Sequence, residues 1–459
     1  MNTPALTIDD IRPCLEGAVP GVMATCDAAG LPNVAYLSQV DYVDSRHVAL
    51  SFQFFNTTRH NVLQNPQVQI LLVHPVTGAL YRVRAHYLRT ETAGALFERM
   101  KARLSGIASH SGMSGVFQLR GADIYAVDLV EHVPKTDLPP PASCGSLLAG
   151  LRRCSERLAE CNDLESLFEA LLENMEREFG IAHSMLLMFD AACGRLYTVA
   201  SRGYDASGVG SEVPLGEGVI GVAARERAPV RISHLTAEYT YSRAVRDSLA
   251  RQGLRDVLET GIPWPGLPEP HSQLAVPVLA GPELVGVLFA ESPQDLRFSY
   301  DDEDALVALA AQLGPLIRHF QAHAESPEEY ATGSGPLAAP VAVQAPASVQ
   351  PSALQVRYYP ADGSIFFDAE YIIKGVAGSV LWTLLQEHDA TGRDEFTNRE
   401  LRLDPRVRLP DVSDNLEARL VLLRQRLAER ASGVALEKAG RGRLRLVVSR
   451  PIALLEVCG

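Results

Sequence analysis

A run punctuated by glycines in the middle of the chain limits the fold more than any other feature. In residues 213–232, Gly216, Gly218 and Gly221 lie where a backbone must turn tightly and then bring a helix close to a sheet. Hairpin-like patterns precede and follow this run at 183–201 and 273–290, and helices with apolar periodicity lie outside both. The run therefore predicts a loop that leads into a short helix beside a sheet.

The segments PLGEGVIG, LAVPVLAGPELVGVLFAES and FSYDDEDALVALAAQLG occur in this order and closely resemble a GAF domain. The resemblance implies a six-stranded antiparallel sheet, helices behind it and a pocket for a small-molecule effector in front. FSYDDE also fits half of a motif of cyclic-nucleotide-binding GAF domains, but Ala290 and Glu291 stand where that motif has Asn and Lys. The half-motif has a structural explanation as well, because Ser299 and Asp302 have the spacing of a helix cap. We expect residues 141–324 to be this sensor domain, with an effector other than a cyclic nucleotide.

Apolar residues recur at heptad-like spacing on both sides of this domain. Leu147, Leu151, Cys154, Leu158 and Cys161 are four and three residues apart in turn, and Leu306, Leu309, Leu313 and Leu316 form a similar stripe. Two such helices from each chain would build a dimer bundle, as they often do in GAF proteins. We therefore expect a homodimer.

Three cysteines, Cys144, Cys154 and Cys161, fall close together near the start of this seam. A spacing of seven residues puts the last two on one helix face about 10 Å apart, too far for one metal ion but suitable for a cluster that bridges two chains. One interpretation is an iron–sulfur cluster or a redox-active cysteine. The other is that they are small apolar residues of the helical seam, which the absence of any Cys-x-x-Cys favours.

Strand-like segments separated by turn signals extend from residue 21 to residue 130 and suggest a small barrel. The segment FQFFNTTRHNVLQNPQVQILLV resembles the pyridoxamine-phosphate-oxidase-like split barrel. The resemblance implies FMN, with its phosphate held by Thr57, Thr58, Arg59 and Asn61, and by Arg82 on the neighbouring strand. Hydroxyl groups and a guanidinium at a helix start suit an anion, although the same polar residues would equally cap that helix. We expect residues 1–140 to be this barrel, and we find no second set of residues for a pyridoxamine phosphate substrate.

The C-terminal part follows a change in composition. Residues 325–352 contain five prolines among Ala, Gly, Ser and Val and predict a flexible linker. Residues 353–459 then show leading strands, three helices and a closing hairpin, and they resemble the winged-helix effector domain of response regulators. The run KAGRGRLRL at 438–446 matches the basic, glycine-containing turn of that family. The resemblance implies that the helix at 414–427 enters the major groove of DNA.

The residues expected to contact DNA lie on this helix and on the hairpin: Arg419, Arg424, Gln425, Arg426, Lys438, Arg441, Arg443 and Arg445. Their arginines suit phosphate contacts. The helix face opposite the leucine stripe is mostly apolar, and only Gln425 on it is a base-reading residue. That face leaves open a second interpretation, in which the winged helix docks a protein partner.

The charge distribution also separates the C-terminal part from the rest. The formal net charge is −13, and the residues before Leu354 hold 26 basic and 40 acidic side chains, against 16 and 15 from Leu354 onward. No stretch approaches eighteen uninterrupted apolar residues, and the first residues do not resemble a secretion signal. We expect a cytoplasmic protein that does not enter a membrane.

The sequence thus predicts a multidomain α+β protein with an antiparallel split β-barrel, a GAF sensor sheet and a winged helix. Its function would be that of a sensory transcriptional regulator, in which the barrel and the sensor receive a redox or small-molecule signal and control DNA binding. Two alternatives stay open: a flavin-dependent oxidoreductase with an accessory GAF domain, and a signalling protein whose winged helix docks a protein. No catalytic triad, phosphate loop or metalloprotease motif occurs, which favours the regulator over the enzyme.

Overall fold

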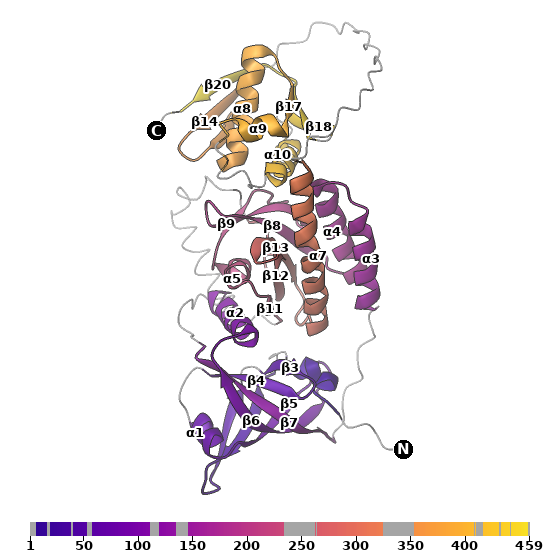
Figure 1. Cartoon of the computed structure of the whole chain (residues 1–459), viewed down its shortest axis with the longest axis vertical. Helices are drawn as coiled ribbons and strands as arrows, with labels where there is room; N and C mark the ends of the chain where they lie inside the picture. The colour runs from indigo at the N-terminus through magenta and orange to yellow at the C-terminus, as the bar shows by residue number, and fades with distance from the viewer. Residues whose placement is uncertain are drawn as a thin grey trace.

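Three folded regions follow one another along the long axis of the computed structural model (Figure 1). We call them the barrel (residues 6–134), the central domain (146–324) and the C-terminal domain (353–457). The structure describes residues 6–15, 19–37, 40–52, 57–110, 119–134, 146–233, 262, 264–324, 353–407, 409, 416–430, 433–440 and 442–457. Within these ranges, every helix is too short or too polar to span a bilayer.

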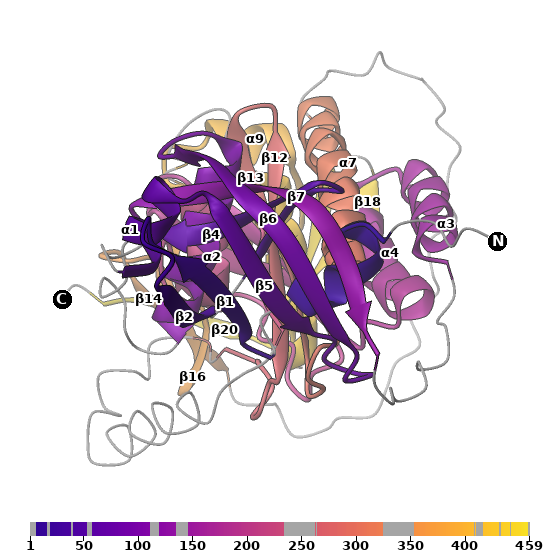
Figure 2. The same ribbon diagram turned by 90° about the horizontal axis from the view of Figure 1, so that it is seen from below.

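The barrel is one antiparallel sheet with strand order β2-β1-β5-β6-β7-β4-β3. Figure 2 looks onto it and shows β6 between β5 and β7. Alternate residues of β1 and β5 point inward, and the core they line includes Met23, Ile70 and Val83. Its elements are η1 (Asp9–Leu15), β1 (Gly21–Cys26), β2 (Pro32–Leu37), β3 (Asp41–Asp44), β4 (His47–Phe52), α1 (Thr57–Gln64), β5 (Gln67–Val73), β6 (Leu80–Glu91), α2 (Ala95–His110) and β7 (Gly121–Val133).

The central domain is built on a six-stranded antiparallel sheet of order β10-β9-β8-β13-β12-β11, as expected. Helices α3, α4 and α7 pack in the core on one face, and α5 packs on the other. Its elements are α3 (Leu147–Ala159), α4 (Leu164–Phe179), β8 (His183–Asp190), β9 (Arg195–Arg202), β10 (Glu212–Pro214), α5 (Gly218–Glu226), β11 (Val230–Ile232), β12 (Ser272–Ala280), β13 (Glu283–Ser292) and α7 (Tyr300–Ala324).

The glycine run has the predicted form, a loop that leads into α5. Gly216 and Gly218 adopt φ of +84° and +59°, which favour glycine. A Cβ on Gly221 would lie 2.2 Å from the Pro214 carbonyl oxygen, so only glycine lets α5 approach β10 this closely.

The apolar stripes that predicted a dimer bundle are largely used inside one chain. Cys154 and Leu158 of α3 are buried, and so are Leu306, Leu309 and Leu313 of α7, all in the core of the central domain. Helix α3 contacts both α4 and α7 of the same chain. The homodimer therefore stays a prediction, because this packing already supplies the stripes with partners.

Helix α2 joins the barrel to the central domain. It packs against α5 and β11, and its Ala102 belongs to the buried cluster on that face of the central sheet. At Gly106 a Cβ would lie 2.3 Å from Cγ1 of Val230, so the backbone of α2 lies directly against the Val230 side chain there. Beside this contact, Arg12 of the barrel bridges Asp301 and Asp304 of α7 at 3.3 and 3.2 Å.

The C-terminal domain holds two small sheets, β16-β15-β14-β20 and β17-β19-β18, around α8. Tyr358 stacks on Trp382 in its core, with ring centroids 4.8 Å apart. The predicted linker, 325–352, lies outside the described residues. The elements are β14 (Leu354–Tyr359), β15 (Ser364–Phe367), β16 (Glu370–Ile373), α8 (Gly375–Thr391), β17 (Glu395–Thr397), α9 (Asn398–Leu403), α10 (Leu416–Arg430), β18 (Val434–Gly440), β19 (Arg443–Val448) and β20 (Ile452–Glu456).

Candidate functional site

The predicted flavin-phosphate residues at the start of α1 are mostly engaged with the barrel itself. Arg59 forms an ion pair with Asp123 of β7, and both side chains are largely buried. Its guanidinium also donates to Thr90 Oγ1 at 3.2 Å. Thr58 Oγ1 accepts a bond of 3.0 Å from Asn33, and Thr57 is exposed.

Two further predicted residues do not join this group. Asn61 is buried and donates to Thr25 Oγ1 at 3.3 Å. Arg82 lies on β6 eight residues before Thr90, the residue of that strand that bonds Arg59, which corresponds to roughly 26 Å along the strand. The charge of the Arg59 guanidinium is thus balanced by the Asp123 carboxylate, and the second cation, Arg82, is distant. The described donors do not fit a phosphate group in this arrangement.

The cysteines do not form a cluster in the described part of the chain. Cys154 is fully buried, and this burial raises the pKa of its thiol to about 12. Cys161 is only partly buried, and Cys144 lies outside the described residues. The described residues contain no group of three or more His, Cys, Asp or Glu side chains that could hold a metal ion. The structure therefore gives no support to an iron–sulfur cluster, and Cys154 packs as a core residue.

The central sheet carries a buried carboxylate near the expected effector pocket. Glu291 at the end of β13 accepts bonds from Leu267 N at 2.7 Å and Gln273 Nε2 at 3.1 Å. Burial raises the pKa of Glu291. The half-motif at the start of α7 has the capping geometry that the sequence suggested, since Ser299 N donates to Asp302 Oδ2 at 2.8 Å and Asp302 N donates to Ser299 Oγ at 3.2 Å. Residues 234–261, which follow β11, lie outside the described residues.

The most extensive group of charged side chains lies where the C-terminal domain meets the central domain, a surface we call the domain junction. Helix α10 packs there against α4 and β9. Four carboxylates of the central domain, which we call the acidic face, each pair with a different cation of the C-terminal domain. The pairs are Asp163–Lys438, Glu165–Arg424 at 2.9 Å, Asp190–Arg419 at 2.9 Å and Glu212–Lys374 at 3.1 Å.

The pair between Asp190 and Arg419 is the most buried of the four. Asp190 ends β8 and also accepts a bond of 3.0 Å from the Ala192 amide, so the β8–β9 turn fixes its position. The Arg419 guanidinium lies over the ring of Tyr197, 5.2 Å from its centroid. Burial alone would raise the pKa of Asp190, but the Arg419 charge and its hydrogen bond outweigh burial and lower it.

The same balance operates at Asp163, the N-cap of α4. Its side chain accepts from Ser166 N at 2.8 Å and pairs with Lys438. Burial would raise the pKa of Asp163, but the hydrogen bonds from Lys438 and Ser166 lower it to about 2. Asp163 and Asp190 are therefore ionised over the whole physiological range.

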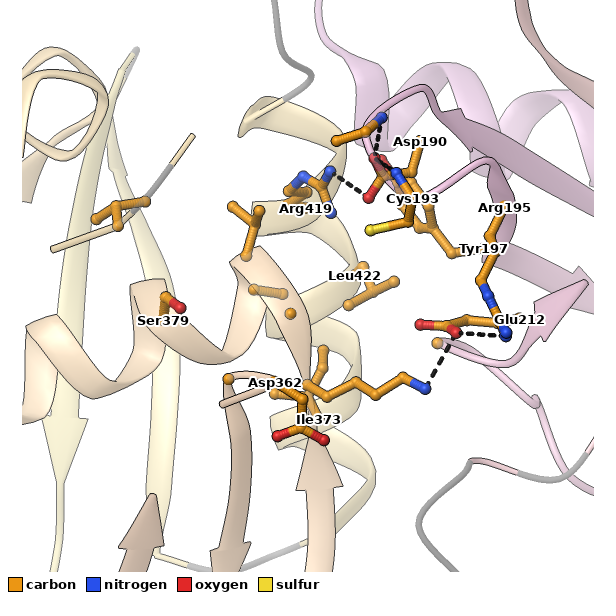
Figure 3. A pocket seen from close by; sticks show the side chains of 18 of the residues that line it. Asp190, Cys193, Arg195, Tyr197, Glu212, Asp362, Ile373, Ser379, Arg419 and Leu422 are labelled. Carbon is orange, nitrogen blue, oxygen red and sulfur yellow. Dashed lines mark hydrogen bonds and ion pairs between the residues drawn. The ribbon is translucent and has the colours of Figure 1, made fainter. Parts of the chain in front are cut away.

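A cavity of about 560 Å³ lies within the domain junction (Figure 3). The central domain contributes the β8–β9 turn and the ends of β9 and β10, and the C-terminal domain contributes the β14–β15 turn, the start of α8 and α10. Figure 3 shows Arg419 beside Asp190 on one side and Glu212 beside Arg195 on another. Glu212 also pairs with Lys374. We call this space the junction cavity.

The predicted DNA-contact residues fall into three groups. Arg419, Arg424 and Lys438 pair with the acidic face, and Gln425 borders a second, smaller gap between α10 and α4. Arg426 is buried and donates to the Ile372 carbonyl oxygen at 3.0 Å, so in this arrangement it is a core residue rather than a surface cation. Arg443 and Arg445 are exposed on β19, and Arg441 lies outside the described residues.

The outer face of α10, which offered few base-reading residues, is covered by protein. Ala418 and Leu422 are buried, and Val421 lines a gap together with Phe168 and Leu172 of α4. Hydrophobic residues of both domains form one continuous buried cluster. The sequence analysis missed the four carboxylates of the acidic face. The only signal for them was the excess of acidic residues before Leu354.

Family models match two parts of the chain. Residues 7–128 match the model described as pyridoxamine 5'-phosphate oxidase, and residues 161–318 match the GAF domain model. The chain therefore contains a pyridoxamine-phosphate-oxidase-like barrel and a GAF domain, as the sequence predicted. A search of curated proteins found no match.

Several solved structures are similar to single domains of the chain. The GAF domain of an Acinetobacter phosphoenolpyruvate-protein phosphotransferase is 24% identical, covering 40% of this chain and 97% of that chain with a TM-score of 0.31. Free methionine-R-sulfoxide reductase from Neisseria meningitidis, in complex with its substrate, is 16% identical, covering 40% and 98% with a TM-score of 0.31. An FMN-binding protein from Syntrophomonas wolfei is 14% identical, covering 28% and 86% with a TM-score of 0.25.

Proposed function

We propose that this protein is a sensory regulator in which the barrel and the GAF domain receive a chemical signal and a C-terminal winged helix carries the response to DNA. The four ion pairs of the domain junction carry the proposal. In these pairs, carboxylates of the central domain bind the cations that DNA phosphates would otherwise bind. The form described above is then the closed form of the regulator.

The order of elements supports a winged helix. Strands β14 to β16 lead into α8, α9 and α10, and the hairpin β18–β19 follows. In such a domain α10 would be the recognition helix and the hairpin would be the wing. Arg443 and Arg445 of the hairpin are exposed even in the closed form, although Arg445 pairs with Glu395 at 2.7 Å within its own domain.

Release of the C-terminal domain would expose the cations that the acidic face now occupies. Arg419, Arg424 and Lys438 come from the two elements that a winged helix presents to DNA. One set of cations serves only one polyanionic surface at a time, so docking and full DNA contact exclude each other. A signal that changes the fraction of the open form changes the apparent DNA affinity by the same factor.

The test uses the full chain with its acidic face neutralised by Asp163→Asn, Glu165→Gln, Asp190→Asn and Glu212→Gln. The amide at 163 and the amide at 190 keep the capping acceptors of those positions. A matched control neutralises four carboxylates away from the junction: Asp44→Asn, Asp128→Asn, Glu131→Gln and Glu156→Gln. Binding to a random-sequence DNA duplex is followed by fluorescence anisotropy at several salt concentrations.

We expect the acidic-face variant to bind the duplex about tenfold more tightly than the wild type, because exposed ion pairs contribute up to about 1 kcal/mol each. The control should gain less, since it has the same net charge but an intact junction. Equal affinities of variant and control would show that the acidic face does not compete with DNA. If no form binds the duplex even at low salt, the protein-docking interpretation of α10 replaces the DNA-binding one.

Flavin binding by the barrel is a second candidate, favoured by the family match of residues 7–128. The ion pair of Arg59 with Asp123 argues against flavin binding, because the carboxylate already pairs with the guanidinium that would hold the flavin phosphate. A bound flavin would supply redox chemistry and would make the oxidoreductase alternative testable. Anaerobic purification followed by visible absorbance and by turnover of reduced nicotinamide decides both points, and the same spectrum would reveal an iron–sulfur cluster.

The remaining assignments belong to the same proposal. We propose that the domains divide at 1–140, 141–324, 325–352 and 353–459, that the chain forms a homodimer and that it works in the cytoplasm. Light scattering of the purified protein tests the homodimer, which predicts twice the chain mass of 49.8 kDa.

A further inference from the structure

We infer that the junction cavity is a binding site for an organic anion with an apolar body, and that this ligand holds the C-terminal domain in its closed position. The cavity lies outside the GAF effector pocket expected in front of the central sheet. Its effect on DNA rests on the proposed function, whereas ligand binding itself does not.

The size and walls of the junction cavity suit a small molecule. Its volume of about 560 Å³ falls in the usual range for ligand pockets, which often form between domains. Apolar side chains from both domains line it, including Tyr197 of β9 and Val376, Val407 and Leu422 of the C-terminal domain. A ligand with a flat or branched hydrocarbon body would remove this apolar surface from water.

The charged groups lie on opposite sides of the cavity, and cations and carboxylates pair differently on the two sides. On one side Asp190 and Arg419 pair one to one and are largely buried. On the other side Arg195 and Lys374 share a single carboxylate, Glu212, at 3.3 and 3.1 Å. Glu212 is therefore shared between two cations, and both of these cations are partly exposed.

A third carboxylate, Asp362, brings the lining to three acidic and three basic side chains, but its oxygens are held by its own turn. Its Oδ1 accepts from Ser364 N at 3.0 Å and its Oδ2 accepts from Ser364 Oγ at 2.7 Å. Lys374 Nζ lies 3.1 Å from Glu212 Oε2. The ammonium and the guanidinium each retain N–H donors beyond the bond to Glu212, and these suit a carboxylate, phosphate or sulfonate group.

The ligand would act on the closed form alone, because neither domain forms the cavity by itself. A molecule that binds only when the domains are docked stabilises docking, and the stabilisation grows with the logarithm of the ligand concentration once that exceeds Kd. Linkage makes the effect reciprocal, so DNA that binds the released domain lowers affinity for the anion by the same factor. The anion would therefore reduce DNA binding.

The test uses the full chain and two fluorescent probes with the same aromatic body: anilinonaphthalene sulfonate, which is an anion, and phenylnaphthylamine, which is uncharged. Lys374→Gln removes one of the cations at the cavity. Lys438→Gln is the matched control, because Lys438 also forms a junction ion pair but does not line the junction cavity. Ala192→Trp fills the cavity mouth from the exposed β8–β9 turn without disturbing a core position.

We expect Lys374→Gln to weaken the sulfonate roughly three- to tenfold and to leave the uncharged probe unchanged. Lys438→Gln should change both probes by less than about twofold, and Ala192→Trp should weaken both by about tenfold or more. Circular dichroism establishes that each variant folds. Saturating sulfonate should also weaken binding of the DNA duplex.

Sulfonate affinity that is unchanged by both Lys374→Gln and Ala192→Trp would overturn the site. Equal losses for the two probes in Lys374→Gln would overturn its preference for an anion. Failure of the DNA assay alone would instead contradict the proposed function, since probe binding is measured without DNA.

Discussion

The two ends of the central domain are joined to their neighbours in different ways. At the barrel end, Ala102 of α2 lies in the buried cluster of the central domain and Gly106 packs against Val230. The nearby Arg231 side chain is completely buried and pairs with Glu303 at 2.7 Å. At the C-terminal end, three of the four ion pairs are partly exposed and a cavity remains between the domains. Both junctions contain buried apolar contacts, but the second also holds a cavity and three partly exposed ion pairs that salt can weaken.

This difference indicates which end of the molecule moves. Buried pairs are costly to break because an unpaired charge is left in a medium of low polarity, whereas exposed pairs exchange readily with water and salt. The barrel and the central domain should therefore act as one body. The C-terminal domain should be the part whose position responds to a signal.

Removing one glutamate from a buried pair and one from an exposed pair gives the largest expected contrast, and the buried pair, Arg231 with Glu303, lies within the central domain beside the barrel end. Glu303→Ala should lower the free energy of unfolding by about 3–5 kcal/mol, because it leaves the buried Arg231 without its carboxylate. Glu165→Ala, which removes the partner of Arg424 from a partly exposed pair, should cost less than about 1 kcal/mol. Urea unfolding measures both, and equal losses would remove the distinction between the two ends.

A side chain at position 106 should loosen the barrel end specifically. Gly106→Leu would overlap Val230, which is branched and buried, and overpacking of this kind costs about 1–3 kcal/mol. Calorimetry should then show the barrel and the central domain melting in separate steps, where the wild type melts them together. A single unchanged transition would mean that α2 is not the element that couples them.

Salt should act mainly on the C-terminal end, because at the barrel end the exposed pairs of Arg12 stand beside the buried packing of α2. Raising the ionic strength to about 1 M shortens the screening length to about 3 Å, which weakens exposed pairs most. Small-angle X-ray scattering should show the longest dimension of the protein increasing. The acidic-face variant should have the extended form already at low salt, and an unchanged profile in both cases would contradict a releasable junction.

The smallest expected effect concerns the protonation of Asp163. Its pKa is lowered from 3.8 to about 2, so this carboxylate stabilises the closed form above pH 3.8, and the contribution is lost as the pH falls toward about 2. Lys438→Gln should raise the pKa of Asp163 part of the way back, because the bonds from Ser166 remain. Carboxyl NMR titration measures the shift, and no shift would show that Lys438 does not contact Asp163 in solution.

Much of the fold followed from local patterns. The glycines at 216, 218 and 221 predicted the turn before α5, and the spacing of Ser299 and Asp302 predicted the start of α7. The candidate sites followed less well. Arg59 was expected to face a phosphate and instead pairs with Asp123, 64 residues away in the sequence. No periodicity in the sequence predicts such a partner, because any strand of the barrel could supply the carboxylate.

The sequence by itself determined which segments become strands and helices and that the C-terminal part is more basic than the rest, since backbone preferences and burial patterns act over a few residues. Only the tertiary structure decided which charges meet. Arg419 and Asp190 are 229 residues apart, and Lys438 and Asp163 are 275 apart. Surface charges follow no repeat, so their partners depend on which two faces come together, and that depends on the packing of whole domains.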